Sequence, residues 1–180
     1  MTQKQNIRGL INRLARLDAG QGWSGDLNPA QRSALEYLGQ ANRFSRAPSH
    51  VADFLGATRG TTSQTLKALV RKGYVSEERS ATDKRSISYT RTAAGQEATL
   101  TTGLMMQSIA ALPDAEINQL EQVLLKLLRN AVAANGHRYF GICHTCRYFK
   151  ARAEGGFCNL LNTALEPFET QQICHEQEPA

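Results

Sequence analysis

The fold is decided by residues 49–91, which read SHVADFLGATRGTTSQTLKALVRKGYVSEERSATDKRSISYTR. Apolar residues first recur at helical spacing, and Gly56 interrupts them. A second helical stretch begins after Thr58, which can cap it, and ends at Gly73. After Gly73 the periodicity changes to that of strands, and a charged tip separates two short runs. The order of helix, glycine turn, helix, glycine and hairpin predicts a winged helix-turn-helix.

Helices are predicted on both sides of this stretch. Apolar residues between Ile7 and Leu17 recur at helical spacing, and Asn28-Pro29 can start a further helix that ends near Asn42. After the hairpin, Thr92 is predicted to cap one helix that carries Leu100, Leu104 and Ile109, and Pro113 opens a last helix that Gly136 ends. The predicted fold class is therefore mainly α, with a two-stranded β-hairpin as the wing.

The chain divides by composition into two parts. Residues 137–180 contain all four cysteines of the 180-residue chain and are rich in aromatic residues. We therefore expect a winged-helix part in residues 1–136, with the helix-turn-helix in 47–73 and the wing in 74–91, and a cysteine-rich extension in 137–180. The N-terminus has no apolar core of a secretory signal, and no apolar run is long enough to span a membrane, so we expect a cytoplasmic protein.

Positive charge is concentrated in the middle of the chain. The net charge is +5, and residues 43–91 hold ten Lys and Arg against four acidic residues. A basic middle between nearly neutral flanks is suited to binding phosphates, although charge alone fits an ordinary solvated surface equally well.

The second helix of the predicted motif carries residues suited to reading DNA in the major groove. Arg59 can pair with guanine, and Gln64 can read adenine or contact a phosphate. At the wing tip, Arg85 is placed to enter or approach the minor groove. The predicted DNA-contacting residues are Arg46, Ser49, His50, Arg59, Gly60, Thr61, Ser63, Gln64, Lys67, Lys84 and Arg85.

Several of these segments resemble the MarR family of dimeric bacterial transcription regulators. The resemblance rests on Phe54-Leu55-Gly56, the helix Thr58–Lys72, the exit Lys72-Gly73-Tyr74-Val75 and the wing Asp83-Lys84-Arg85-Ser86, and the number of flanking helices also fits. It implies a homodimer that binds a palindromic operator in double-stranded DNA, with residues 5–17 and 114–134 as the dimerisation region. It also implies a regulator, with repression as the expected mode of action, and not an enzyme.

The four cysteines, Cys143, Cys146, Cys158 and Cys174, have the spacing Cys-x2-Cys-x11-Cys-x15-Cys. Four thiols within 32 residues of a chain expected in the cytoplasm favour metal ligation over disulfides. A single close pair with two isolated ligands favours an iron–sulfur cluster, [2Fe–2S] or [4Fe–4S], over a zinc site, which usually has two close pairs. Zinc remains the alternative, and four free buried thiols are a further one.

Two functional hypotheses follow. In the first, the cysteine cluster senses iron, oxygen or redox state and changes DNA binding by repositioning the dimerisation helices. In the second, a structural zinc ion only stabilises the dimer, and a small molecule binds in an apolar pocket that Trp23, Tyr37 and Phe44 could line. A Cys-x-x-Cys thiol oxidoreductase is disfavoured, because the motif does not follow a strand in a βαβ unit.

Overall fold

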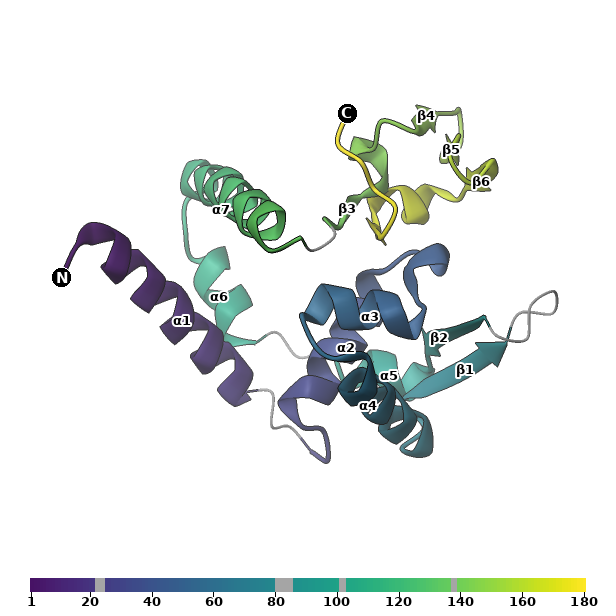
Figure 1. Cartoon of the computed structure of the whole chain (residues 1–180), viewed down its shortest axis with the longest axis horizontal. Coiled ribbons are helices and arrows are strands. Elements are labelled where there is room, and N and C mark those ends of the chain that lie inside the picture. The colour runs from purple at the N-terminus through teal and green to yellow at the C-terminus, as the bar shows by residue number, and fades with distance from the viewer. Residues whose placement is uncertain (22–24, 80–85, 101–102, 137–138) are drawn as a thin grey trace.

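The computed structural model describes residues 1–21, 25–79, 86–100, 103–136 and 139–180. Three parts are visible in Figure 1: a helical lobe with a two-stranded hairpin, two long helices to one side, and a C-terminal module of short strands above the lobe. Within those ranges, no helix has both the length and the apolar composition needed to cross a lipid bilayer. The predicted fold class, mainly α with a small hairpin wing, is confirmed.

The helical lobe contains the predicted helix-turn-helix. Gly56 ends the first helix of the motif with φ 61°, and Gly73 follows the second with φ 77°. Both values lie in the left-handed region that glycine adopts without strain, so these two residues fix where the helices end. The lobe consists of α2 (Pro29–Gln40), α3 (Pro48–Leu55), α4 (Arg59–Arg71), β1 (Val75–Arg79), β2 (Ile87–Arg91) and α5 (Ala93–Glu97).

Apolar residues from all three central helices form the core of the lobe. Leu35, Val51, Leu66 and Leu69 are each fully buried. The hairpin joins this core through Tyr89, whose backbone N–H donates to the carbonyl of Arg46 at 3.1 Å. The wing therefore starts from a fixed base next to α3 and α4.

The single helix predicted after Thr92 is wrong. Thr92 does cap a helix, but α5 ends at Glu97, and a separate helix, α6 (Leu104–Ala110), follows. At the end of α5, Thr99 Oγ1 donates back to the carbonyl of Gln96 at 3.0 Å and accepts from Arg91 at 2.7 Å, and Gly103 precedes α6 as its N-cap. A β-branched side chain bonded to the preceding turn competes with continuation of the helix.

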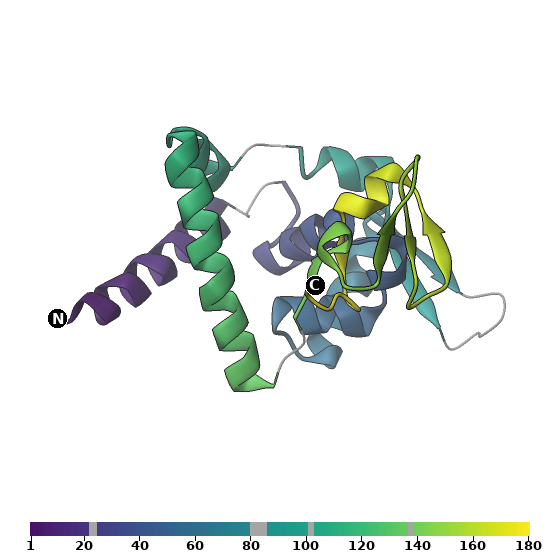
Figure 2. The same ribbon diagram turned by 90° about the horizontal axis from the view of Figure 1, so that it is seen from above.

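The two long helices lie apart from the lobe core. They are α1 (Gln3–Gln21) and α7 (Asp114–Asn135), and Figure 2 shows both on the side opposite to the wing. Gly136 ends α7 with φ 64°, as predicted. Nearly every described residue of both helices is exposed, including their apolar ones, so neither helix is covered within one chain.

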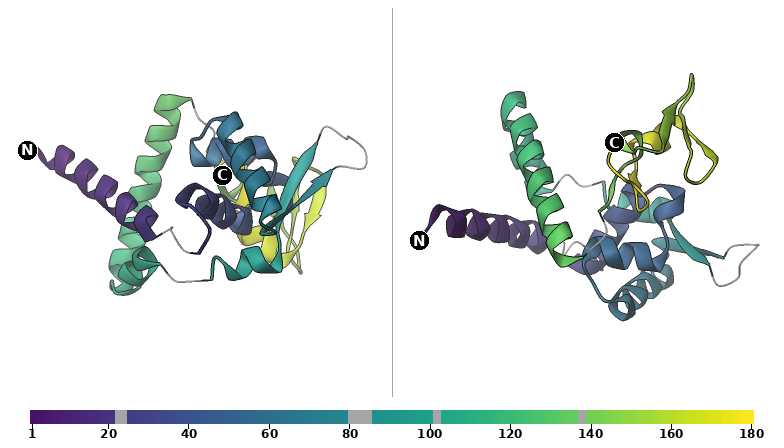
Figure 3. Two further views of the ribbon diagram at one scale, coloured as in Figure 1. Left: turned by 90° about the horizontal axis from the view of Figure 1, so that it is seen from below. Right: turned by 45° about the horizontal axis from the view of Figure 1, so that its top comes forward.

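The cysteine module, defined here as residues 139–180, is built from short strands and turns. Figure 3 shows it packed against the lobe and reaching beyond it as a small hairpin. Its elements are β3 (Gly141–Ile142), η2 (Cys143–Thr145), β4 (Phe149–Ala151), β5 (Gly156–Cys158), β6 (Thr163–Leu165), η3 (Pro167–Gln171) and β7 (Ile173–Cys174). Strand β3 pairs with β7, and β4, β5 and β6 form an antiparallel sheet in that order.

Candidate nucleic-acid interface and cysteine site

Helix α4 has a capped and exposed N-terminus. Thr58 precedes the helix in an extended conformation, and its Oγ1 accepts a hydrogen bond from the backbone N–H of Thr61 at 3.1 Å. This bond satisfies one of the free N–H groups that every helix start carries. Thr62, Leu66 and Leu69 hold the other face of α4 in the core. The first turn of α4 is therefore rigid and open to solvent.

The exposed face of α4 brings together the residues predicted to read DNA. Positions 60, 64 and 67 recur every three or four residues, so Gly60, Gln64 and Lys67 lie on one face of the helix. The major groove of DNA is wide enough to admit an α-helix, and α4 presents this face to solvent beside the hairpin (Figure 1). Arg59, Gly60, Thr61, Gln64 and Lys67 are exposed, and Ser63 is half-buried.

Two of the predicted DNA contacts lie between the lobe and the cysteine module. Arg46 is half-buried, its Nε donates to the carbonyl of Ala41 at 3.0 Å, and burial lowers the pKa of its guanidinium. The ring of His50 stacks on the ring of His175, with the ring centres 3.7 Å apart. The stack gives His50 a part in packing the module, and the Arg46 bond holds the turn that faces it, whereas the DNA contacts of both residues stay a prediction.

The remaining predicted contacts are in α3 and the wing. Ser49 is half-buried in the first turn of α3. Lys84 and Arg85 belong to the segment 80–85 and lie outside the described residues. Strands β1 and β2 lead to this segment in antiparallel register, with Arg79 opposite Ile87.

Helices α1 and α7 carry an open apolar surface. Leu124 is 44% exposed and Leu128 is 50% exposed on α7, and Leu14 is 48% exposed on α1. An apolar groove of about 670 Å³ opens along α7, with Ile11 of α1 and Ile109 of α6 also in its wall. A long helix without packing on its apolar side is marginally stable in water, so this surface needs a partner.

All four cysteines line one small cavity in the module. Cys143 and Cys174 are buried, and Cys146 and Cys158 are half-buried. The cavity has a volume of about 20 Å³ and an apolar surround that includes Phe149, Leu160 and Leu165. The sequence predicted that these thiols converge, and the fold brings them together through η2, the end of β5 and β7.

The two buried thiols, Cys143 and Cys174, affect each other's pKa. The Cys143 thiol donates a hydrogen bond to the sulfur of Cys174, which raises the pKa of Cys143 and lowers the pKa of Cys174. Such a coupled pair releases its first proton more readily than an isolated thiol and its second less readily. The lowered pKa of Cys174 favours its thiolate, which is the form in which a cysteine binds a soft metal.

The four thiols surround the cavity without forming the closed ligand set of a metal centre. Across the described ranges, no group of three or more His, Cys, Asp and Glu side chains is arranged to hold a metal ion. The two histidines beside the cysteines have other contacts, since His144 Nδ1 lies 3.1 Å from the carbonyl of Thr170 and His175 stacks on His50. Metal binding would therefore require the thiols to shift.

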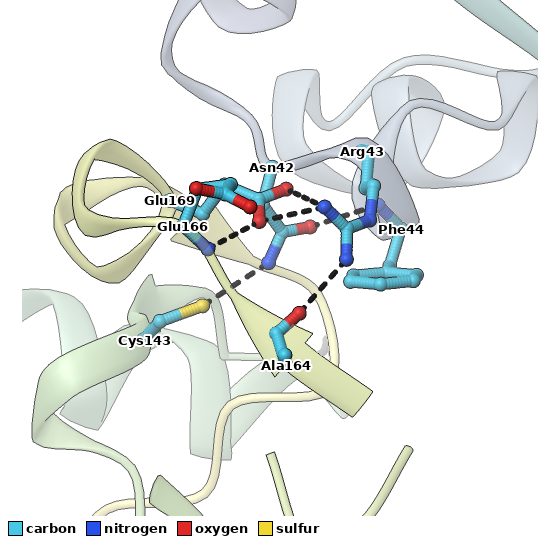
Figure 4. Close-up of polar contacts among 7 residues, drawn as sticks. All are labelled: Asn42, Arg43, Phe44, Cys143, Ala164, Glu166 and Glu169. Atoms are coloured by element: carbon cyan, nitrogen blue, oxygen red, sulfur yellow. Dashed lines mark hydrogen bonds and ion pairs between the residues drawn. The ribbon is translucent and has the colours of Figure 1, made fainter. Parts of the chain in front are cut away.

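The sequence did not identify the residues that attach the module to the lobe (Figure 4). Asn42 Nδ2 donates to Cys143 Sγ at 3.1 Å. Arg43 Nη1 donates to both carboxylate oxygens of Glu169 at 2.7 Å, and Glu169 is 1% exposed. The only signal for Asn42 in the sequence was its place at the end of a predicted helix.

The aromatic residues predicted to line a small-ligand pocket lie in different surroundings. Tyr37 is buried in the lobe core, where its hydroxyl donates to the carbonyl of Ser45 at 2.6 Å. Phe44 packs against the cysteine module and under the Arg43 guanidinium, which lies 4.6 Å from its ring centre. Trp23 lies outside the described residues.

Comparisons with known proteins agree with this fold. Residues 25–86 match the model of the MarR family. The structure is similar to the S. aureus MepR–DNA complex, with 20% identity, 72% of this chain and 98% of that chain covered, and a TM-score of 0.56. It is also similar to Streptococcus pneumoniae FabT in complex with DNA, with 20% identity, 73% and 96% covered, and a TM-score of 0.55. Similarity to wild-type MarR from E. coli in its apo form has 22% identity, 71% and 98% covered, and a TM-score of 0.54. No curated protein sequence matched the chain.

Proposed function

We propose that this chain is a MarR-type transcription regulator that binds double-stranded DNA as a homodimer. The observation that carries the proposal is α4, with its capped first turn exposed beside the hairpin and its opposite face fixed in the core. The match of residues 25–86 to the MarR family supports it, as do similar structures that were solved in complex with DNA.

In this proposal, some side chains of α4 contact bases and others contact phosphates. Arg59 and Gln64 contact base edges, because both side chains can form two hydrogen bonds to one base in the major groove. Lys67 neutralises a phosphate and so contributes to affinity without regard to sequence. Replacing a base-contacting residue weakens DNA binding by about 1–3 kcal/mol and relaxes sequence preference. Losing a phosphate contact lowers the slope of log affinity against log salt concentration by about one.

The second copy of the chain covers the open apolar surface of α1 and α7. A two-fold dimer places two α4 helices in successive major grooves, about 34 Å apart, and reads a palindromic site. The exposed leucines of α7 and the apolar groove beside them support this assignment.

The DNA-binding proposal is tested by selecting binding sites from random duplexes and measuring affinity at several salt concentrations. Arg59→Ala and Gln64→Ala are expected to lose affinity and sequence preference, and Lys67→Ala is expected to lose affinity on all sequences alike. Lys150→Ala is the matched control, because Lys150 is an exposed cation on β4 of the cysteine module, outside both α4 and the dimerisation helices. Equal affinity for all four variants would refute the assignment of α4.

We further propose that the four cysteines hold an iron–sulfur cluster that makes the regulator responsive to iron, oxygen or redox state. Support comes from the convergence of four soft donors on one cavity with an apolar wall. A hydrogen bond from Asn42 to Cys143 Sγ is of the kind that tunes a cluster-ligating sulfur. When bound, the cluster would supply the sensitivity to iron or oxidants.

Zinc is a second candidate, which the size of the cavity favours. A volume of about 20 Å³ suits one ion after a small shift of the thiols, whereas a cluster requires the thiols to move much further apart. Purification without oxygen, followed by visible absorbance and analysis of iron, sulfide and zinc, separates the two. Iron with sulfide and a coloured protein supports the cluster, and a colourless protein with one zinc per chain supports zinc.

A further inference from the structure

The cysteine module is attached to the turn that leads into the helix-turn-helix. This α2–α3 turn, residues 41–46, contains the short helix η1 (Arg43–Ser45). The backbone N–H of Asn42 donates to the carbonyl of Ile173 at 2.9 Å, and the backbone N–H of His175 donates to Ser45 Oγ at 2.8 Å. Both contacts on the module side adjoin Cys174, so two points of the turn are bonded next to one cysteine.

Asn42 is bonded at both ends of its side chain (Figure 4). Its Nδ2 donates to Cys143 Sγ at 3.1 Å. Its Oδ1 accepts from the backbone N–H of Phe44 at 3.1 Å and from Ser45 Oγ at 2.7 Å. Asn42 and Ser45 are each 1% exposed. The amide therefore cannot follow a movement of the sulfur without disturbing the bonds that shape the turn.

The same turn positions α3 and the wing. The carbonyl of Ser45 accepts from the Tyr37 hydroxyl of α2 at 2.6 Å, and the carbonyl of Arg46 accepts from the backbone N–H of Tyr89 in β2 at 3.1 Å. Helix α3 starts two residues later, at Pro48, and its first turn carries His50, which stacks on His175. A change in the turn therefore moves α3 and the wing, the two elements on either side of α4 in the chain.

We propose that Asn42 is a positioning residue that relays the state of the cysteine site to α3 and α4 within a single chain. The relay rests on the proposed function, because it requires that the four cysteines bind a metal. A thiolate that is held by a metal is a stronger and differently placed acceptor than a thiol, so metal binding changes the bond from Asn42 Nδ2.

Asn42→Asp is the variant that isolates this bond. The carboxylate keeps an oxygen acceptor for Phe44 N and Ser45 Oγ but has no N–H to donate to Cys143. The matched control is Asn159→Asp, which adds the same charge beside Cys158 on an exposed residue of the module. Cadmium ion is the probe, since it is a soft ion that thiolates bind with an ultraviolet absorbance of their own.

Three measurements on the full chain, with and without cadmium, test the relay. They are cadmium binding by ultraviolet absorbance, hydrogen exchange of the backbone amides, and affinity for a selected DNA site. In the wild type we expect cadmium to change protection in residues 42–71 and to change DNA affinity by between about 5-fold and 150-fold. In Asn42→Asp we expect cadmium still to bind, while both responses shrink towards none. Asn159→Asp should respond as the wild type does.

The outcomes distinguish a failure of the relay from a failure of the proposed metal site or of DNA binding. A wild type that takes up no cadmium would overturn the metal site and the relay together, whereas a wild type that does not bind DNA would overturn the regulator. Cadmium uptake with changed protection in α1 and α7 but not in residues 42–71 would overturn the relay alone, as would a full response in Asn42→Asp. The wild-type exchange map decides between these outcomes even where Asn42→Asp does not fold.

Discussion

Arg43→Ala is expected to loosen the cysteine module, because Arg43 and Glu169 form an ion pair between the lobe and the module. Arg43 Nη1 lies 2.7 Å from both oxygens of Glu169, and Nη2 donates to the carbonyl of Ala164 at 2.9 Å. The Glu169 side chain is 2% exposed and the Arg43 side chain is 45% exposed. The substitution thus removes a half-exposed cation and leaves a buried anion.

The expected cost follows from what remains around the carboxylate. After Arg43→Ala, Glu169 keeps the backbone N–H of Glu166, which donates to Oε2 at 2.9 Å. A buried acceptor that loses a partner costs about 1–3 kcal/mol. The roughly 3–5 kcal/mol typical of a fully buried pair is too high here, since water reaches the Arg43 side of the contact. We therefore expect a loss of about 2 kcal/mol.

Glu169→Gln is the comparison that shows whether the unpaired buried charge causes the loss of stability in Arg43→Ala. The amide still accepts a hydrogen bond and leaves no buried charge, so we expect a loss of about 1 kcal/mol, close to that of one hydrogen bond. Urea unfolding of the reduced, metal-free chain, followed by circular dichroism, measures both. The reasoning is refuted if Arg43→Ala costs less than about 0.5 kcal/mol, or if Glu169→Gln is the more damaging of the two.

Three further predictions concern the helices. Thr58→Ala should lower the free energy of unfolding by about 1 kcal/mol, because α4 loses its cap, while Thr58→Ser should lose almost nothing in the same urea titration; equal losses would contradict the capping role. Leu124→Glu should convert the dimer to a monomer in sedimentation, with a partial loss of helix content because α1 and α7 lose their packing, and an unchanged mass would remove α7 from the interface. Gly95→Ala should cost about 1–3 kcal/mol in thermal unfolding, because its Cβ would lie 2.1 Å from the carbonyl oxygen of Tyr74. Gly9→Ala, with open space around it in α1, should instead stabilise by up to about 1 kcal/mol.

Local signals predicted most of the lobe. Asn28 caps α2, Thr58 caps α4, and Gly56 and Gly73 follow the helices that they were expected to end. These predictions depend on bonds between residues at most four positions apart, so the sequence contains all the information that they need. The same reasoning failed after Thr92, where Thr99 is bonded to Arg91, a residue of β2 that lies outside the predicted helix.

The cysteine site was predictable in its members but not in its surroundings. The spacing of the four cysteines indicated a shared centre, and they do line one cavity. The partners of that centre, however, lie far away in the sequence, since Asn42 and Cys143 are 101 positions apart and Ser45 and His175 are 130 positions apart. No periodicity or turn signal encodes such a contact, and the stacking of His50 on His175 was accordingly missed.

The position of the module bears on how a signal at the cysteines would reach DNA. The expectation from sequence was that the dimerisation helices move. Buried, directional hydrogen bonds lead instead to the α2–α3 turn, from Asn42 to Cys143 and from His175 to Ser45. A contact with α7 is weaker in kind, since it is an exposed Arg129 guanidinium 5.4 Å from the ring centre of Tyr139. If each chain adjusts its own α4, a duplex with one half-site should respond to the metal state as a full palindrome does. A response confined to the full palindrome would favour movement of the dimerisation helices.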